Sequence, residues 1–383
     1  MAPSLEEPVV TVAPTTAKFT VPVLAEDLAG DNKFGYQPGR TPVTQHDNYA
    51  YEDFLPSFPD IHWAPLEYTP YQDKGLRGDP KFRNILRDAT AVFDLNPKIG
   101  TEIHGVDLAK LDDAQRDDLA RLIAYRGVVF FRSQKNFDIE AQRQLGQYWG
   151  KLHKHATTSV PRKPGLEDVH VVYTGDNSGD NRALFTPSFL WHSDVTYEIQ
   201  PPSYTSLKLL SGPPPRRRWR HPLVLTIRCL RYTLLAYAKL PQRPHGPSLS
   251  RHASQRLPGT RPAITGWNGL FFNPGFVKKI VGIPAAESDA IIRFLTDVIA
   301  TTQEMHARFS WGEEDVAIWD NRSTNHSASY GFTPHRRHAV RVAVHAEKPV
   351  LKESGKSQED ELNALYGLPT VNKDGSRQSN YND

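Results

Sequence analysis

The spacing of apolar residues predicts a few helices in the central and C-terminal parts of the chain. Three stretches have apolar residues at helical spacing, and they predict helices over residues 111–125, 138–149 and 288–300. Gly127 follows the first stretch and is a natural helix end, because glycine adopts the left-handed backbone of a C-terminal cap. Asp138 opens the second stretch, where an aspartate side chain accepts hydrogen bonds from free backbone N–H groups. Both boundaries support the helix predictions.

Shorter runs, either fully apolar or alternating with polar residues, predict β-strands. They cover residues 92–95, 128–131, 169–173, 305–311, 316–319 and 337–345. A few helices among many short strands predict a mainly β fold, a sandwich or barrel with helices packed outside. We assign residues 91–350 to one domain. Residues 1–90 lack sustained periodicity and are predicted to be an extended N-terminal arm, and residues 351–383 a C-terminal tail.

The composition is that of an ordinary globular protein, with 38% apolar and 23% charged residues among 383. The single cysteine, Cys229, excludes an internal disulfide framework and any multi-cysteine metal site, and suits a reducing compartment. The chain shows neither a secretory leader nor about 18 consecutive apolar residues. These features predict a cytoplasmic protein without a membrane partner, and they leave open whether it forms a homo-oligomer.

Charge is distributed unevenly around the net value of +3. The chain has no Asp or Glu between Glu198 and Glu287, and eleven Lys and Arg residues lie between Arg216 and Arg261. A nucleic-acid interpretation would make Arg216–Arg220 a phosphate-binding or nuclear-targeting patch, but we predict no nucleic-acid partner. The rest of the chain is mildly acidic, so this basic insert requires its own explanation.

Two histidines and an aspartate are candidate metal ligands. His192 and Asp194 lie two residues apart in the run from Phe189 to Tyr197, which we predict to be a strand, so both would project from one face. His326 ends a polar turn after the apolar run 316–319. Such a set forms the facial triad that holds non-heme Fe(II) and leaves coordination positions open. Taken alone, His192 and Asp194 are equally explained as polar residues on a surface strand.

The predicted strand 337–345 carries two arginines on one face. Arg337 and Arg341 alternate with valines that belong in a core. Arginines are costly to bury unless anions meet them, and the planar guanidinium suits carboxylate or sulfonate oxygens. A solvated strand face is the usual explanation of this pattern. The nearby candidate metal ligands favour two anion sites instead.

At family spacing, these motifs resemble the taurine and alkylsulfonate dioxygenases. The resemblance extends from about residue 92 to 349 and rests on the following motifs: Trp191-His192-Ser193-Asp194-Val195-Thr196, Trp319-Asp320-Asn321-Arg322, His326, Arg336-Arg337, Arg341, Gly105-Val106-Asp107-Leu108, Val128-Val129-Phe130-Phe131-Arg132, Leu152-His153-Lys154-His155 and Asn273-Pro274-Gly275-Phe276. Members of this family depend on Fe(II) and 2-oxoglutarate and have a double-stranded β-helix, or jelly-roll, fold. The resemblance therefore implies that fold here.

The resemblance also assigns roles to individual residues. It implies that His192, Asp194 and His326 ligate iron and that Arg337 binds the distal carboxylate of 2-oxoglutarate. Arg341 and His155 would then bind a substrate sulfonate, and Phe276 would line the substrate pocket. His153 and His155 are also compatible with a polar turn or a second metal pair, and Phe276 with an ordinary core position.

The implied reaction consumes O2 and 2-oxoglutarate and hydroxylates the carbon next to sulfur in a small, taurine-like sulfonate. The product collapses to an aldehyde and sulfite. An alkyl sulfate ester or another small acid is an alternative substrate on the same scaffold. A catalytically impaired β-barrel binding protein is the alternative from another class.

Residues 213–263 depart from the family pattern. After Gly212-Pro213-Pro214 the family continues with Gly-Gly-Asp-Thr-Leu-Trp, whose threonine contacts 2-oxoglutarate, whereas this chain has Pro215 and the basic run Arg216–Arg220. Synonymous codons exist for which a shift of one base from Arg217 onward restores that motif. A frame shift would also explain the missing acids and the stray Cys229. As printed, the segment predicts impaired 2-oxoglutarate binding.

Overall fold

The computed structural model describes most of the predicted domain. The described residues are 49–59, 66–155, 158–174, 190–213, 262–267, 269–280, 282–328 and 335–349, with the backbone of 224–229, 254–255 and 259–260 and single residues at 358, 361, 364 and 367. Residues 1–48, most of the basic insert and most of the predicted tail lie outside this set. The predictions for those segments therefore stay predictions.

A seven-stranded sheet forms the centre of the described structure. Its strands, in spatial order, are β2 (Ala91–Asp94), β3 (Thr101–His104), β4 (Val128–Phe131), β14 (Val316–Asp320), β7 (Pro202–Ser211), β16 (Arg337–His345) and β6 (His170–Thr174). All neighbours are antiparallel except β3 and β4. The predicted mainly β architecture is confirmed, and β16 has the predicted bounds.

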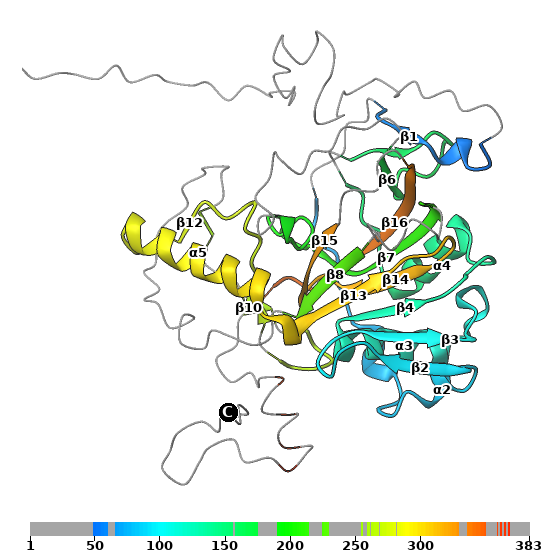
Figure 1. Ribbon diagram of the computed structural model, residues 1–383, viewed down its shortest axis with the longest axis horizontal. Helices are drawn as coiled ribbons and strands as arrows, with labels where there is room; N and C mark the ends of the chain where they lie inside the picture. The colour runs from blue at the N-terminus through cyan, green and yellow to red at the C-terminus, as the bar shows by residue number, and fades with distance from the viewer. Residues whose placement is uncertain are drawn as a thin grey trace, which may run out of the picture. The chain divides into compact units, whose positions relative to one another are not determined.

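A three-stranded sheet packs against one face of the large sheet, as Figure 1 shows. Its order is β13 (His306–Ser310), β8 (Val224–Cys229) and β15 (Thr324–Ala328), all antiparallel. Apolar side chains from both sheets form the core between them, where the rings of Phe130 and Phe309 stack with centroids 4.1 Å apart. Sheet-on-sheet packing of this kind buries alternate residues of each strand.

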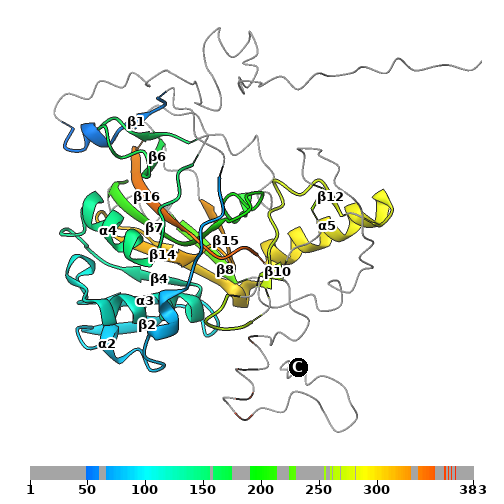
Figure 2. The same ribbon diagram turned by 180° about the vertical axis from the view of Figure 1, so that it is seen from behind.

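Helices cover the opposite face of the large sheet, seen from behind in Figure 2. They are α3 (Asp113–Arg126) and α4 (Ile139–Trp149), and their apolar side chains share a core with Val340, Val342 and Val344 of β16. Gly127 ends α3 with φ of 72°, and the Asp138 side chain accepts a hydrogen bond from the Ala141 N–H. Both predicted helix boundaries are confirmed.

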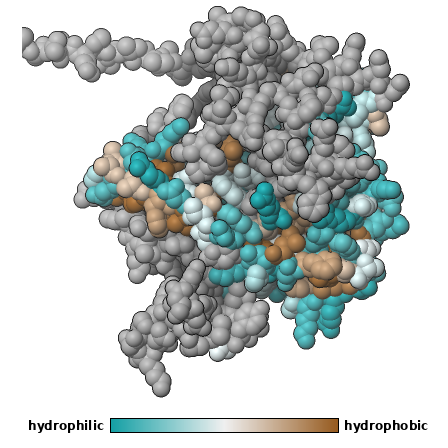
Figure 3. Space-filling model, in the orientation of Figure 1, coloured by the Kyte–Doolittle hydropathy of each residue, from teal (hydrophilic) through white to brown (hydrophobic). Residues whose placement is uncertain are grey.

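The other helix predicted from the sequence, α5 (Ala285–Thr301), packs beside a separate small core that includes Trp191 and Phe272. The remaining short elements are α2 (Arg83–Leu86), η1 (Glu52–Phe54), η2 (Lys74–Arg77), η3 (Leu108–Lys110), η7 (Gln303–Met305) and the strand pairs β1–β5 (Pro56–Ser57, Val160–Pro161), β10–β11 (Gly259–Thr260, Gly269–Leu270) and β9–β12 (Ser254–Gln255, Lys279–Ile280). Among the described residues, no helix is long and apolar enough to span a bilayer. Figure 3 shows hydrophilic residues interspersed with hydrophobic ones over the described part of one face.

His338 is covered by a segment that lies far from it in the chain. Its side chain is fully buried on β16, where Nδ1 lies 2.8 Å from the Tyr49 hydroxyl and Nε2 lies 2.8 Å from the Phe54 carbonyl oxygen. The segment from Tyr49 to Ser57 supplies this cover. A strand pattern alone does not reveal a distant segment that packs over it.

Candidate active site

His192 and His326 are held together by the backbone. The His192 N–H donates to the His326 carbonyl oxygen at 2.9 Å and the His326 N–H donates to the His192 carbonyl oxygen at 2.8 Å, in an antiparallel bridge. The strand predicted around His192 does not extend further, because residues 194–197 form a turn in which Val195 has φ of 42°. This turn, rather than strand alternation, places Asp194 beside the two rings.

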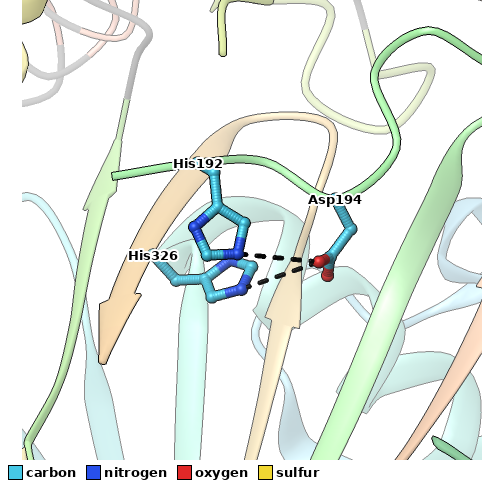
Figure 4. A group of neighbouring side chains, drawn as sticks. All are labelled: His192, Asp194 and His326. Carbon is cyan, nitrogen blue, oxygen red and sulfur yellow. Dashed lines mark ion pairs between the residues drawn. The ribbon is translucent and has the colours of Figure 1, made fainter. Parts of the chain in front are cut away.

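The three predicted metal ligands converge, as Figure 4 shows. One donor atom from each of His192, Asp194 and His326 lies within 4.8 Å of the others. Asp194 Oδ1 is 3.8 Å from the Nε2 atoms of both histidines. The side chains of Asp194 and His326 are 8% exposed and that of His192 is 40% exposed. The group is therefore buried on one side and accessible on the other.

The protonation of the group suits a divalent cation. His192 Nδ1 donates to the Leu190 carbonyl oxygen at 2.8 Å, so the other ring nitrogen, Nε2, is the one that faces Asp194. Burial, followed by the charge of His192, lowers the pKa of His326 to about 3. Burial alone would raise the pKa of Asp194, but the charges of Arg341 and the histidines hold it below its usual value. Two imidazoles and one carboxylate match the donor set of a non-heme Fe(II) site.

Buried amides fix the backbone that carries Asp194. Asn321 Oδ1 accepts a hydrogen bond from the Asp194 N–H at 2.7 Å, and its Nδ2 donates to the Asp194 carbonyl oxygen at 3.1 Å. Asn273 Nδ2 donates to the Ser193 carbonyl oxygen at 2.9 Å. The Ser193 Oγ lies 2.7 Å from the Asn325 side-chain oxygen. Sequence reasoning gave these residues no role, although a polar run leading into His326 was the available signal.

Arg341 directly contacts the ligand group. Its Nη1 donates to both carboxylate oxygens of Asp194, at 2.8 and 2.9 Å, and the residue is 9% exposed. Arg337 is 8% exposed and lies four positions earlier on β16. The structure therefore buries both arginines predicted to meet anions, and it brings Arg341 to the candidate metal site.

His155 lies near Arg341 in a group of histidines. Its ring is 5.9 Å from that of His153 and 5.6 Å from that of His170, between centroids. Burial, followed by the charge of Arg341, lowers the pKa of His155 to about 4. His153 Nε2 lies 2.8 Å from Glu198 Oε2, so a carboxylate already occupies that nitrogen. His170 was not identified from the sequence.

Phe276 lies at the surface near the turn of residues 194–197, which contains Asp194. It is 38% exposed, and its ring packs edge-on against that of Tyr197, with centroids 5.1 Å apart. Tyr197 belongs to the same turn as Asp194 and is 52% exposed. This position is not that of an ordinary core aromatic. Its predicted role in lining the substrate pocket stays a prediction.

Comparisons with known proteins agree with this geometry. The chain matches the model of the "Taurine catabolism dioxygenase TauD, TfdA family" over residues 91–216 and 216–343. It is 36% identical to a Schizosaccharomyces pombe protein assigned as an α-ketoglutarate-dependent sulfonate dioxygenase, over 82% of this chain and 84% of that protein. It is 32% identical to the α-ketoglutarate-dependent sulfonate dioxygenase of Saccharomyces cerevisiae, over 78% and 79%.

A solved taurine dioxygenase from Burkholderia xenovorans resembles the structure as well. The TM-score is 0.53 at 28% sequence identity, and the match covers 70% of this chain and 94% of that one. The family match spans more than half of the chain and includes His192, Asp194, His326 and both arginines. The chain belongs to the TauD/TfdA family of dioxygenases, which use Fe(II) and 2-oxoglutarate.

Proposed function

We propose that this dioxygenase hydroxylates the carbon next to sulfur in a small sulfonate, and that the product releases sulfite and an aldehyde. The observation that carries the proposal is the contact between Arg341 and Asp194, because it places a buried guanidinium beside a two-histidine, one-carboxylate group. A substrate anion bound by Arg341 would have its neighbouring carbon close to the metal. We also propose that the two sheets are those of a jelly roll.

His192, Asp194 and His326 would hold Fe(II), and Arg337 would hold the distal carboxylate of 2-oxoglutarate. Arg337 and Arg341 share one face of β16, four residues apart, so their Cα atoms are about 13 Å apart. This separation supports two distinct anion sites. Bound Fe(II) and 2-oxoglutarate supply the oxidising power to hydroxylate a C–H bond with O2, giving succinate and CO2.

The residues of the chain contribute position and electrostatics. In this structure Asp194 neutralises Arg341, and a metal cation would share the charge of that carboxylate. Arg341 would then attract an incoming anion more strongly. Holding the substrate by its head group keeps one C–H bond at a fixed distance from the metal and thereby lowers the entropic cost of reaction.

Sulfite release from a panel of small sulfonates, with Fe(II), 2-oxoglutarate and O2 present, tests this proposal. Arg341→Ala should lower kcat/KM by about 10- to 100-fold, the effect of losing a charge-assisted hydrogen bond. Arg87→Ala, which removes an exposed arginine paired with Asp112, is the control and should be unchanged. Fe(II) affinity is measured for each variant because Arg341 contacts Asp194. Equal activity on uncharged analogues would contradict the anion role.

An alkyl sulfate ester is the second candidate substrate, because it offers the same tetrahedral anion. Release of inorganic sulfate instead of sulfite would identify it. A cytoplasmic location and the absence of a nucleic-acid partner stay predictions. Because the basic insert replaces a family motif, a catalytically impaired binding protein is the remaining alternative. Measurable turnover of 2-oxoglutarate would exclude it.

A further inference from the structure

A small cavity lies beside the candidate active site, between β6, β16 and the segment that carries His155. Its lining includes His155, Thr158, His170, Arg341 and Ala343, and also the carboxylates Glu167 and Asp168, of which Asp168 is paired with Arg143. Ala343 is a small residue two positions after Arg341, on the same face of β16, so it leaves space beside the guanidinium. The cavity volume is about 20 Å³, which is room for one oxygen-sized group, such as a single oxygen of an anionic head group.

His170 lies directly opposite Arg341. The antiparallel register of β6 and β16 pairs these two residues, so their side chains share one face of the sheet with Cβ atoms about 5 Å apart. The His170 ring is tilted by 33° from that of His155, with centroids 5.6 Å apart. Arg341, His170 and His155 are potential hydrogen-bond donors to the cavity. They come from β16, from β6 and from the segment before β5, respectively.

Two polar atoms in this cavity have no partner. Among the described residues, His170 Nδ1 and Thr158 Oγ1 are buried and make no hydrogen bond. A buried polar group without a partner costs about 1–3 kcal/mol, so such groups in a native structure require an explanation. Burial, followed by the charge of Arg341, lowers the pKa of His170, so the ring is neutral and keeps one N–H to donate.

We propose that His170 is a specificity-determining residue that donates a hydrogen bond to the substrate's anionic head group, alongside Arg341 and His155. The inference rests on the proposed function and extends it. A sulfonate or a sulfate monoester presents three oxygens in a pyramid, whereas a carboxylate presents two in a plane. Donors from three segments match the tetrahedral anion and leave one donor unsatisfied by a carboxylate. The cavity therefore selects tetrahedral anions over carboxylates of similar length.

Calorimetric binding to the anaerobic protein loaded with Fe(II) and 2-oxoglutarate tests this selection, with ethanesulfonate, ethyl sulfate and propionate as probes. The wild type should bind both tetrahedral anions more tightly than propionate. His170→Leu should weaken their binding about tenfold, the effect of one hydrogen bond to a charged group, and change propionate binding less than about threefold. His170→Gln retains a donor and should recover part of the loss. The tighter of the two tetrahedral probes indicates the natural head group.

His338→Leu is the matched control, because it removes a buried histidine whose two nitrogens are already engaged outside the cavity. It should lower thermal stability and leave the ratio of anion affinities unchanged. An unchanged ratio in both His170 variants, with the fold verified by circular dichroism, would overturn the inference. Tight ethanesulfonate binding without sulfite release would contradict the proposed function alone. Failure of every probe to bind the wild type would overturn both.

Discussion

Asn321 is not one of the candidate metal ligands, but it fixes the backbone of one of them, Asp194. Its amide accepts from the Asp194 N–H and donates to the Asp194 carbonyl oxygen, and the residue is fully buried. The turn at Asp194 includes a valine with positive φ, a conformation that β-branched residues rarely adopt without support. Asn321 supplies part of that support.

Asn321→Ala is therefore expected to weaken Fe(II) binding about 10- to 100-fold, as is typical when hydrogen bonds behind metal ligands are lost. Metal titration under anaerobic conditions measures this change. Asn136→Ala removes an exposed amide that donates to Asp107, and it should leave the affinity unchanged. Wild-type affinity in Asn321→Ala would show that the turn holds Asp194 without this amide.

At this scale the sequence predicted the three side chains that converge and missed the residues that support them. His192, Asp194 and His326 have side chains whose chemistry is recognisable without a structure. The roles of Asn273, Asn321 and His170 depend on which segments meet in space, and local patterns do not contain that information. The same holds for His338, whose cover comes from residues nearly three hundred positions away.

Among the elements, the alternation of apolar and polar residues predicted β16 fully and did not predict β7. β16 alternates between valines that face the helices and arginines that face the site, so its bounds were predicted in full. β7 lies between β14 and β16 and is buried along nearly all of its ten residues, so it shows no alternation. It also contains Lys208, whose Nζ is buried and donates to the carbonyl oxygens of Gln134 and Phe137. A charged residue inside a buried strand interrupts the apolar run by which such a strand is recognised in a sequence.

Arg322 links the segment that contains Asp73 to the large sheet through buried ion pairs. It is 4% exposed, and its guanidinium donates to Asp73 at 2.7 Å, to Asp320 at 2.8 Å and to Glu347 at 2.9 Å. Arg322→Met leaves buried carboxylates without their cation and should reduce the free energy of unfolding by about 3–5 kcal/mol. Urea denaturation measures the loss. Arg83→Met, which removes an exposed ion pair with Asp79, is the control, and equally small effects of both variants would contradict this role.

His338 couples β16 to the segment that covers it, and it makes stability depend on pH. Burial lowers its pKa to about 4 in the folded state, whereas an unfolded histidine titrates near 6.5. As pH falls below 6.5 the unfolded chain binds the proton first, so stability is complete above 6.5 and declines until about pH 4. At about pH 4 and below, the loss in the free energy of unfolding caused by His338 reaches about 3 kcal/mol.

Replacing His338 by Gln should therefore flatten the dependence of the free energy of unfolding on pH between about 6.5 and 4. Denaturant unfolding at a series of pH values measures the slope. Val340→Ala, a core truncation on the same strand, should lower stability by a similar amount at every pH. If His338→Gln keeps the wild-type slope, other buried groups cause the acid sensitivity.

For the whole molecule, the described residues form a mainly β fold whose large sheet is covered by helices on one face and by the small sheet on the other. That layering follows from the short strands and amphipathic helices visible in the sequence. The basic insert is different, because it begins at residue 216, where the two segments matched by the family model meet. The frame-shift explanation stays a prediction, and peptide masses covering residues 214–261 of the natural protein would decide it.

The central claim is that His192, Asp194 and His326 form an iron site that drives 2-oxoglutarate turnover. Its most direct test is the Fe(II)-dependent conversion of 2-oxoglutarate to succinate by the wild type and by His326→Ala, which removes the most buried histidine of the group. Turnover should require added Fe(II), stop with a chelator, and fall below detection in the variant. Succinate production by His326→Ala at the wild-type rate, with Fe(II) present, would contradict the claim.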